Sequence, residues 1–130
     1  MIHPDMKVAD LMSTALVTAR IDDTMDLAEF DMKTARIRHV LVLDHNNSLV
    51  GIVSDRDILR AFGARGTNKL ILGAIMSQQP VMVRDSAPAR EALEIMLERK
   101  ISCLPVEGDE GQLVGVVTET DFMRLLYEEL

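Results

Sequence analysis

The stretch Gly51-Ile52-Val53-Ser54-Asp55-Arg56-Asp57 decides the fold, because it returns 64 residues later as Gly115-Val116-Val117-Thr118-Glu119-Thr120-Asp121. Each copy reads as an apolar strand that ends on a hydroxyl residue, with an aspartate three positions later and a helical pattern after it. Residues 8–62 align with residues 72–126 without a gap and share 14 identities in 55 positions, against about 3 expected from average composition. The sequence therefore predicts two copies of one structural unit.

Composition limits the class of protein. The chain has 130 residues, and 48% of them are hydrophobic, which suffices for the core of one ordinary domain. The net charge of −7 argues against a nucleic acid or a membrane as partner, because both need a concentrated positive field. The single cysteine, Cys103, excludes an internal disulfide, and no apolar run has the length of a signal peptide or a membrane span. We expect a cytoplasmic protein.

Within each copy the apolar periodicity predicts the order βαββα, and hence an α+β fold. The first copy is expected to contain a helical turn at Val8–Met12, a short strand at Leu16–Ala19, a helix that begins after Thr24, strands at His39–Leu43 and Leu49–Val53, and a closing helix. The second copy is expected to contain a helix with Ala89, Ala92 and Met96 on one face, strands at Cys103–Glu107 and Leu113–Val117, and a closing helix. The glycine-containing segment 63–69 should end the first closing helix. The predicted repeats are 1–66 and 67–130, packed as one module.

Several of these residues also match a known pattern: the openings Asp10-Leu11-Met12-Ser13 and Ala74-Ile75-Met76-Ser77, the strand 101–106, and the two Gly-x-x-hydroxyl-x-x-Asp junctions. In them the chain resembles a tandem pair of cystathionine-β-synthase (CBS) domains, a Bateman module. The resemblance implies two repeats related by pseudo-two-fold symmetry, which bind AMP, ADP or ATP in clefts between their sheets. Leu41 departs from the family pattern, because Pro105 stands at this place in the second copy.

The two junctions allow two compatible interpretations. In the first, Ser54 and Thr118 cap helices, and Asp57 and Asp121 lie favourably in the first turn. In the second, the amides and hydroxyl at the helix start hold a phosphate, while the carboxylate accepts hydrogen bonds from a ribose. A capping box prefers Glu or Gln at the third position, so the aspartates favour ligand contact.

Basic residues make the two copies unequal. The resemblance implies that Ile37 and Ile101 line an apolar purine slot and that the next two positions face the phosphates. Arg38, His39 and Arg56 can donate to phosphate oxygens, whereas their counterparts Ser102, Cys103 and Thr120 offer no comparable charge. The first cleft should therefore bind more strongly. Alternatively, Arg36 and Arg38 are simply solvated. Thr18 and Val83 are predicted to contact the base through either their backbone or their side chains.

Catalytic patterns are poor. His3, His39 and His45 have no metal-ligand spacing with Cys103, so no metal site is expected. Cys103 and His39 occupy equivalent positions and would suit a thiol nucleophile and its base, but a small buried hydrophobe is the favoured interpretation of this cysteine. No phosphate-loop lysine or nucleophile elbow is present. We expect a non-enzymatic regulatory module that needs no cofactor and takes an adenine nucleotide as regulatory ligand.

The helices carry more apolar side chains than one buried face requires. Leu27 and Phe30 fall off the stripe of the first helix, and the closing segment has a wide apolar band: Phe122, Met123, Leu125, Leu126, Tyr127 and Leu130. We expect a homodimer through these helices, as the resemblance also implies, with an enzyme, transporter or transcription factor as target. Alternatively, the core wraps further around the helices. The alternative function is a ligand-free dimerisation or interaction scaffold.

Overall fold

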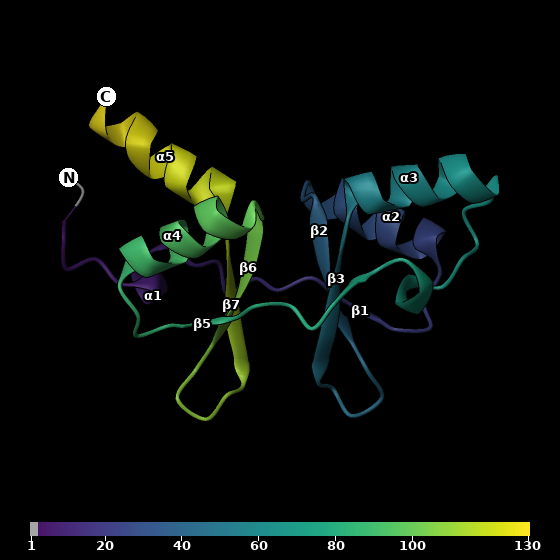
Figure 1. The fold of residues 1–130 in the computed structure, drawn as a ribbon, viewed down its shortest axis with the longest axis horizontal. Helices are drawn as coiled ribbons and strands as arrows, with labels where there is room; N and C mark the ends of the chain where they lie inside the picture. Colours follow the sequence, from purple (N-terminus) through teal and green to yellow (C-terminus); the bar gives the residue numbers. More distant parts are fainter. Residues whose placement is uncertain (1–2) are drawn as a thin grey trace. The chain divides into compact units, whose positions relative to one another are not determined.

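The computed structural model describes residues 3–130, which form two compact units. One comprises Val17–Pro80 and is called the Ser54 unit here; the other joins the residues up to Leu16 with Val81–Leu130 and is called the Thr118 unit. Each unit contains a sheet and helices in the predicted order βαββα, so the α+β prediction with two repeats is confirmed (Figure 1).

The Ser54 unit contains a four-stranded sheet in the order β1-β2-β3-β4. Its elements are β1 (Thr18–Arg20), α2 (Met25–Ala35), β2 (His39–Leu43), β3 (Leu49–Ser54), α3 (Asp55–Arg65), the 3-10 helix η1 (Leu72–Ala74) and β4 (Ser77–Gln78). Strand β1 is parallel to β2, whereas β2, β3 and β4 are antiparallel to their neighbours. The strand expected at 16–19 thus lies one to two residues later, at Thr18–Arg20.

The helices of the Ser54 unit pack on one face of this sheet. Met25, Ala28 and Met32 recur at helical spacing in α2 and are buried in the same core as Val40 and Val53. Helix α3 runs through Gly63 and ends at Arg65, where the left-handed backbone of the cap residue Gly66 (φ 68°) closes it. This confirms that segment 63–69 ends the helix, and the achiral residue is used where a Cβ would be strained.

The Thr118 unit repeats this plan. Its elements are α1 (Val8–Leu11), β5 (Val83–Arg84), α4 (Ala89–Arg99), β6 (Cys103–Glu107), β7 (Leu113–Thr118) and α5 (Glu119–Glu129), with the strand order β5-β6-β7. Four of these elements, from α4 to α5, begin and end 64 residues after their counterparts in the Ser54 unit. Pro105 lies opposite Val116 as Leu41 lies opposite Ile52, so the departure from the family pattern leaves the strand register unchanged.

The two repeats exchange their opening segments. Val8, from the first repeat, is fully buried in the core of the Thr118 unit, and its amide donates to the carbonyl oxygen of Ala87 (2.9 Å). Its counterpart Leu72, from the second repeat, is fully buried in the core of the Ser54 unit. The compact units therefore differ from the sequence repeats 1–66 and 67–130, because each repeat supplies a piece of the other's core.

Glycines in the repeated stretch make room for this exchange. A Cβ at Gly51 would lie 2.9 Å from the carbonyl oxygen of Ser77 and against the Met76 side chain. A Cβ at Gly115 would lie 3.0 Å from the carbonyl oxygen of Ser13 and against the Met12 side chain. The Met-Ser opening of each repeat thus lies across the glycine of the other. Within residues 3–130, no helix is both long and apolar enough to cross a membrane.

Candidate functional site

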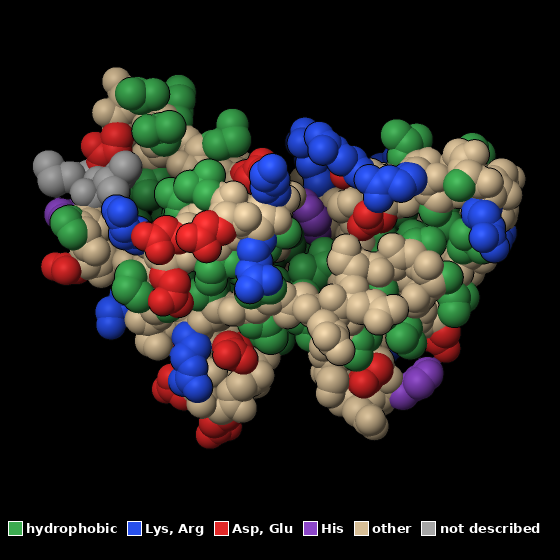
Figure 2. Space-filling model, in the orientation of Figure 1, with side chains coloured by type: hydrophobic (Ala, Val, Ile, Leu, Met, Phe, Trp, Pro, Cys, Tyr) green, Lys and Arg blue, Asp and Glu red, His purple; other side chains and the backbone are tan. Residues whose placement is uncertain are grey.

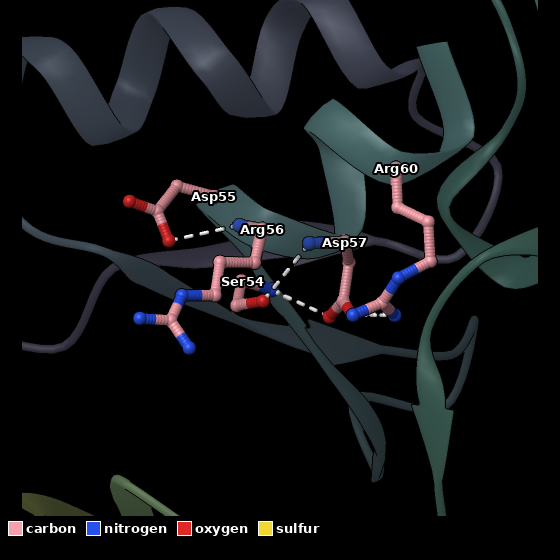
Figure 3. A network of polar contacts seen from close by, with 5 residues as sticks. All are labelled: Ser54, Asp55, Arg56, Asp57 and Arg60. Atoms are coloured by element: carbon pink, nitrogen blue, oxygen red, sulfur yellow. Dashed lines mark hydrogen bonds and ion pairs between the residues drawn. The ribbon is translucent and has the colours of Figure 1, made fainter. Parts of the chain in front are cut away.

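The Ser54 junction, residues 54–57, lies where β3 passes directly into α3. The backbone of Ser54 is extended (φ −101°, ψ 165°), and its Oγ accepts a hydrogen bond from the amide of Asp57 (3.1 Å). In return the amide of Ser54 donates to Oδ2 of Asp57 (2.8 Å) (Figure 3). This reciprocal pair satisfies two backbone donors at the helix start and fixes the aspartate side chain.

The Thr118 junction, residues 118–121, has the same frame. The amide of Thr118 donates to Oδ2 of Asp121 at 2.8 Å, and the Thr118 hydroxyl lies 3.4 Å from the same oxygen. Both carboxylates are mostly covered, with 19% of the Asp57 side chain and 15% of the Asp121 side chain exposed. The hydroxyl cap is therefore confirmed at Ser54, whereas at Thr118 the contact found is that of the backbone amide with the aspartate.

The short side chains of these aspartates are compatible with a cap, so their length alone is no argument for a ligand, and ligand contact stays a prediction. The extended backbone of Ser54 brings its amide within 2.8 Å of the Asp57 carboxylate, so an acid shorter than the preferred Glu still reaches it. Capping alone explains the position of Oδ2. The other carboxylate oxygen, Oδ1, takes no part in the cap.

That second oxygen faces an arginine in both repeats. Oδ1 of Asp57 lies 3.6 Å from an Nη of Arg60, and Oδ1 of Asp121 lies 3.9 Å from an Nη of Arg124. Both arginines are largely exposed. Sequence reasoning missed this pair of residues, although Arg60 and Arg124 are one of the identities at the offset of 64. Each aspartate therefore offers an anionic acceptor that has an exposed cation beside it.

The strand topology brings three predicted site residues to the same end of neighbouring strands. Strands β1 and β2 are parallel and begin at this end of the sheet, and the antiparallel strand β3 finishes there (Figure 1). His39 lies directly opposite Ser54, and Thr18 lies opposite Leu41. Since side chains alternate between faces, Thr18, His39 and Ser54 share the face opposite the buried Val40 and Val53.

Ile37 and Arg38 lie elsewhere, on a hollow of about 360 Å³ at the other face. Half-buried Ile37 packs against the core of the Ser54 unit, close to α2 and α3. Asp57 lines a separate hollow of about 330 Å³, whose other walls come from α3 and the segment 70–75. The structure thus divides the predicted residues among three surfaces that meet around the start of α3.

In the Thr118 unit, the predicted site residues are less accessible to a base. Val83 is only 3% exposed and lies in the core, which contradicts a side-chain contact with a base; a backbone contact stays a prediction. The residue equivalent to Thr18 is Met82, and the equivalent of Val83 is Ala19. Ile101 is half-buried against the same core, as Ile37 is in the other unit.

Cys103 is buried beneath the Thr118 junction. It lies opposite Thr118 in the β6–β7 ladder, and burial, together with the negative charge of Asp121, raises the pKa of its thiol to about 12. A thiolate, which a nucleophile requires, is therefore not formed near neutral pH. This supports the interpretation of Cys103 as a small buried hydrophobe.

Positive charge gathers around the Ser54 junction. Figure 2 shows Lys and Arg side chains over the part of the Ser54 unit where β2 and α3 begin. For residues 3–130, no hydrogen bond or ion pair is found for the exposed guanidinium groups of Arg36, Arg38 and Arg56. In Figure 3, the Asp55 carboxylate is directed at the backbone amide of Arg56 and not at its guanidinium. The described part of the chain contains no group of three or more His, Cys, Asp or Glu side chains that could hold a metal ion.

Comparison with known proteins identifies this architecture. The model of the CBS domain matches residues 8–64 and again residues 72–128. A CBS domain-containing protein of Dictyostelium discoideum is 34% identical, over 95% of this chain and 92% of its own length. The chain also matches inosine-5'-monophosphate dehydrogenase of Methanocaldococcus jannaschii at 30% identity, but over only 23% of that enzyme.

Two solved structures with bound ligands are similar. The CBS domain pair of protein MJ0100, in complex with 5'-methylthioadenosine and S-adenosyl-L-methionine, has a TM-score of 0.88 at 28% identity and covers 98% of this chain and 100% of that one. CBSX2 in complex with AMP has a TM-score of 0.78 at 28% identity and covers 95% of this chain and 98% of that one. Two family matches in tandem, on two βαββα repeats, lead to one assignment: the chain belongs to the CBS domain family and carries a pair of CBS domains.

Proposed function

We propose that this chain is a regulatory module that binds an adenine nucleotide of the AMP, ADP or ATP type at the Ser54 junction and performs no catalysis. The observation that carries the proposal is the Ser54–Asp57 pair, which leaves one carboxylate oxygen outside the cap. At the same helix start lies the guanidinium of Arg56, for which residues 3–130 offer no partner. A carboxylate can accept hydrogen bonds from the ribose hydroxyls, and guanidinium groups donate to phosphate oxygens. The AMP complex of CBSX2 supports an adenine nucleotide as ligand class.

The Thr118 junction is proposed as the weaker site. It keeps the aspartate and a hydroxyl residue, but Ser102 and Thr120 replace Arg38 and Arg56. Arg124 remains beside Asp121, so the ribose end of such a site is preserved while the phosphate end has less positive charge. We expect one strong site and one weak or empty site per chain.

A stability screen tests the proposal. AMP, ADP, ATP, NAD and S-adenosylmethionine are each added at millimolar concentration, and the melting temperature is followed by circular dichroism. A ligand present at about 100 times its dissociation constant adds about 2.7 kcal/mol to the free energy of unfolding. A rise in melting temperature with an adenine nucleotide supports the proposal, whereas no rise with any of the five compounds contradicts it.

Binding becomes regulation only if the ligand favours one arrangement of the repeats, or of a dimer, over another. We propose this rearrangement as the signal that a target enzyme, transporter or transcription factor reads. Small-angle scattering with and without the best ligand of the screen is the direct test. Identical profiles at saturation would contradict a rearrangement.

A second candidate function, a ligand-free dimerisation scaffold, is favoured by the helix surfaces. Leu27, Phe30, Leu59 and Phe62, from α2 and α3, are each at least half exposed. On α4, on α5 and directly after α5 the exposed group comprises Leu93, Leu97, Met123, Leu126, Tyr127 and Leu130. These side chains are exposed on the helices of their units, and a concentration of large exposed apolar side chains is typical of an interface. We propose a homodimer through these helices, whichever function applies.

A further inference from the structure

The hollow between α2 and α3 carries positive charge that neither capping nor core packing explains. It has a volume of about 360 Å³ and lies at the end of α2, where β2 and α3 begin. Its lining is Glu29, Met32, Lys33, Arg36, Ile37, Arg38, Asp55 and Ile58. Three cations and two anions therefore share one small concave surface.

Both anions already have partners. An oxygen of Glu29 lies 3.7 Å from Nζ of Lys33, one helical turn away. Oδ1 of Asp55 accepts a hydrogen bond from the amide of Arg56 (2.9 Å) at the start of α3, where a carboxylate is favoured by the helix dipole. Arg36 and Arg38 are thus left without an anionic partner in the described chain.

The helix dipole accounts for only one of these cations. Arg36 ends α2 in the left-handed conformation (φ 56°), and Lys100 ends α4 in the same way (φ 55°). A positive side chain at a helix C-terminus is stabilised by the exposed carbonyl groups. That reason holds in both repeats, whereas Arg38 has only Ser102 as counterpart.

The floor of the hollow is apolar. Met32 and Ile58 are each 4% exposed, and Ile37 is half-buried beside them. Charges that approach such a floor lose part of the surrounding water, so an anion there interacts more strongly with arginine than it does at an open surface. The lining therefore suits a compact anionic group with more than one charge.

The hollow adjoins the proposed nucleotide site. The carbonyl oxygen of Arg38 accepts a hydrogen bond from the amide of Asp55 (2.9 Å), and the next pair along the same two strands is His39 opposite Ser54. One strand residue spans about 3.3 Å. An extended chain of phosphates that starts at Ser54 can therefore pass around the start of β2 to Arg38 and Arg36.

We propose that this hollow receives the terminal phosphates of a nucleoside di- or triphosphate, so that the Ser54 unit selects ADP and ATP over AMP. The inference rests on the proposed nucleotide function and adds the ligand class to it. The second repeat lacks the feature, because Leu93, Leu97 and Ser102 stand where the first has Glu29, Lys33 and Arg38. Selection by phosphate number is thus a property of one repeat.

Titration calorimetry at constant ionic strength tests this proposal with AMP, ADP, ATP and inorganic triphosphate. The parent chain is compared with Arg36→Gln and with the matched control Lys100→Gln, both of which keep a non-glycine residue at the helix end. The loss of one charge-assisted contact lowers affinity about tenfold. We expect ATP to bind about tenfold or more tightly than AMP, Arg36→Gln to remove most of that difference, and Lys100→Gln to leave it unchanged.

The outcomes separate the two proposals. Equal affinity of the parent for AMP and ATP overturns the inference and leaves nucleotide binding standing. An ATP preference that survives in Arg36→Gln also overturns it, because the extra phosphates then bind elsewhere. Binding of inorganic triphosphate alone, without any nucleotide, identifies the hollow as a free polyphosphate site and overturns both the nucleotide-tail proposal and the proposed function.

Discussion

Replacement of Gly51 by alanine tests the exchange of opening segments. The new Cβ would lie 2.9 Å from the carbonyl oxygen of Ser77 and 2.8 Å from Cγ of Met76. The methionine can turn away, but the carbonyl belongs to β4, which pairs with β3 through Gly51 and Gln78. Overpacking against a fixed backbone costs about 1–3 kcal/mol, which exceeds the gain of about 0.5–1 kcal/mol from a less flexible unfolded chain. We expect Gly51→Ala to be destabilised.

Gly63→Ala supplies the matched control. Gly63 lies within α3, and a Cβ at this position would have no neighbouring atom within 4 Å. Alanine there should stabilise the chain by about 0.5–1 kcal/mol, because glycine is a poor helix former. Urea unfolding followed by circular dichroism measures both variants. If Gly51→Ala is as stable as the parent while Gly63→Ala behaves as expected, the opening of the second repeat does not lie across Gly51.

Further predictions concern the surface and the thiol. In the folded chain, the Lys69 ammonium (2.5 Å away) and the Thr24 hydroxyl lower the pKa of Asp26 from 3.8 to about 2, so Lys69→Gln should raise this pKa. The stabilisation that the pair contributes above pH 3.8 is lost as the pH falls towards 2. Carboxyl NMR titration of the parent and the variant measures the pKa of Asp26. An unchanged pKa in the variant would refute the pairing. Cys103 should react with a thiol reagent only after unfolding, because burial raises its pKa to about 12; rapid modification of the folded chain would contradict its burial. Phe30→Glu should convert a dimer into a monomer by light scattering, and a monomeric parent would rule the dimer out.

The sequence predicts the repeated helices and strands well because each one follows from the pattern of apolar residues within its own segment. The period of Met25, Ala28 and Met32 in α2, and the apolar runs of β3 and β7, each produce one element whose bounds agree within a residue or two. Because the two copies align at a constant offset of 64 residues, a helix or strand predicted in one repeat is also predicted at the equivalent residues of the other. This part of the fold needs no knowledge of contacts between distant residues.

Other features depend on geometry that the sequence does not carry. Val8 is buried in the core of the Thr118 unit, with residues far from it in the sequence. Its local sequence does not distinguish it from any other apolar residue of a helix. The contact of Asp57 with the Ser54 amide depends on the extended backbone of Ser54, and the usual residue preference at this position points the other way. The predicted contact of Val83 with a base is left to its backbone, because its side chain is buried in the core of the Thr118 unit, and the sequence of so short a strand does not show which face each residue takes.

The Ser54 junction is proposed to bind an adenine nucleotide through Asp57, and one substitution isolates this role from capping. In Asp57→Asn the side-chain oxygen can still accept the hydrogen bond from the Ser54 amide, so the helix cap is kept while the negative charge is removed. Asp121→Asn makes the same change at the other junction.

Titration calorimetry with ATP on the parent, Asp57→Asn and Asp121→Asn is the most direct measurement. We predict that Asp57→Asn weakens ATP binding about tenfold or more, since hydrogen bonds to a charged group contribute about 1.5–3 kcal/mol, while Asp121→Asn leaves the strong site within about twofold of the parent. Equal ATP affinity in the parent and in Asp57→Asn would contradict a ribose contact at Asp57.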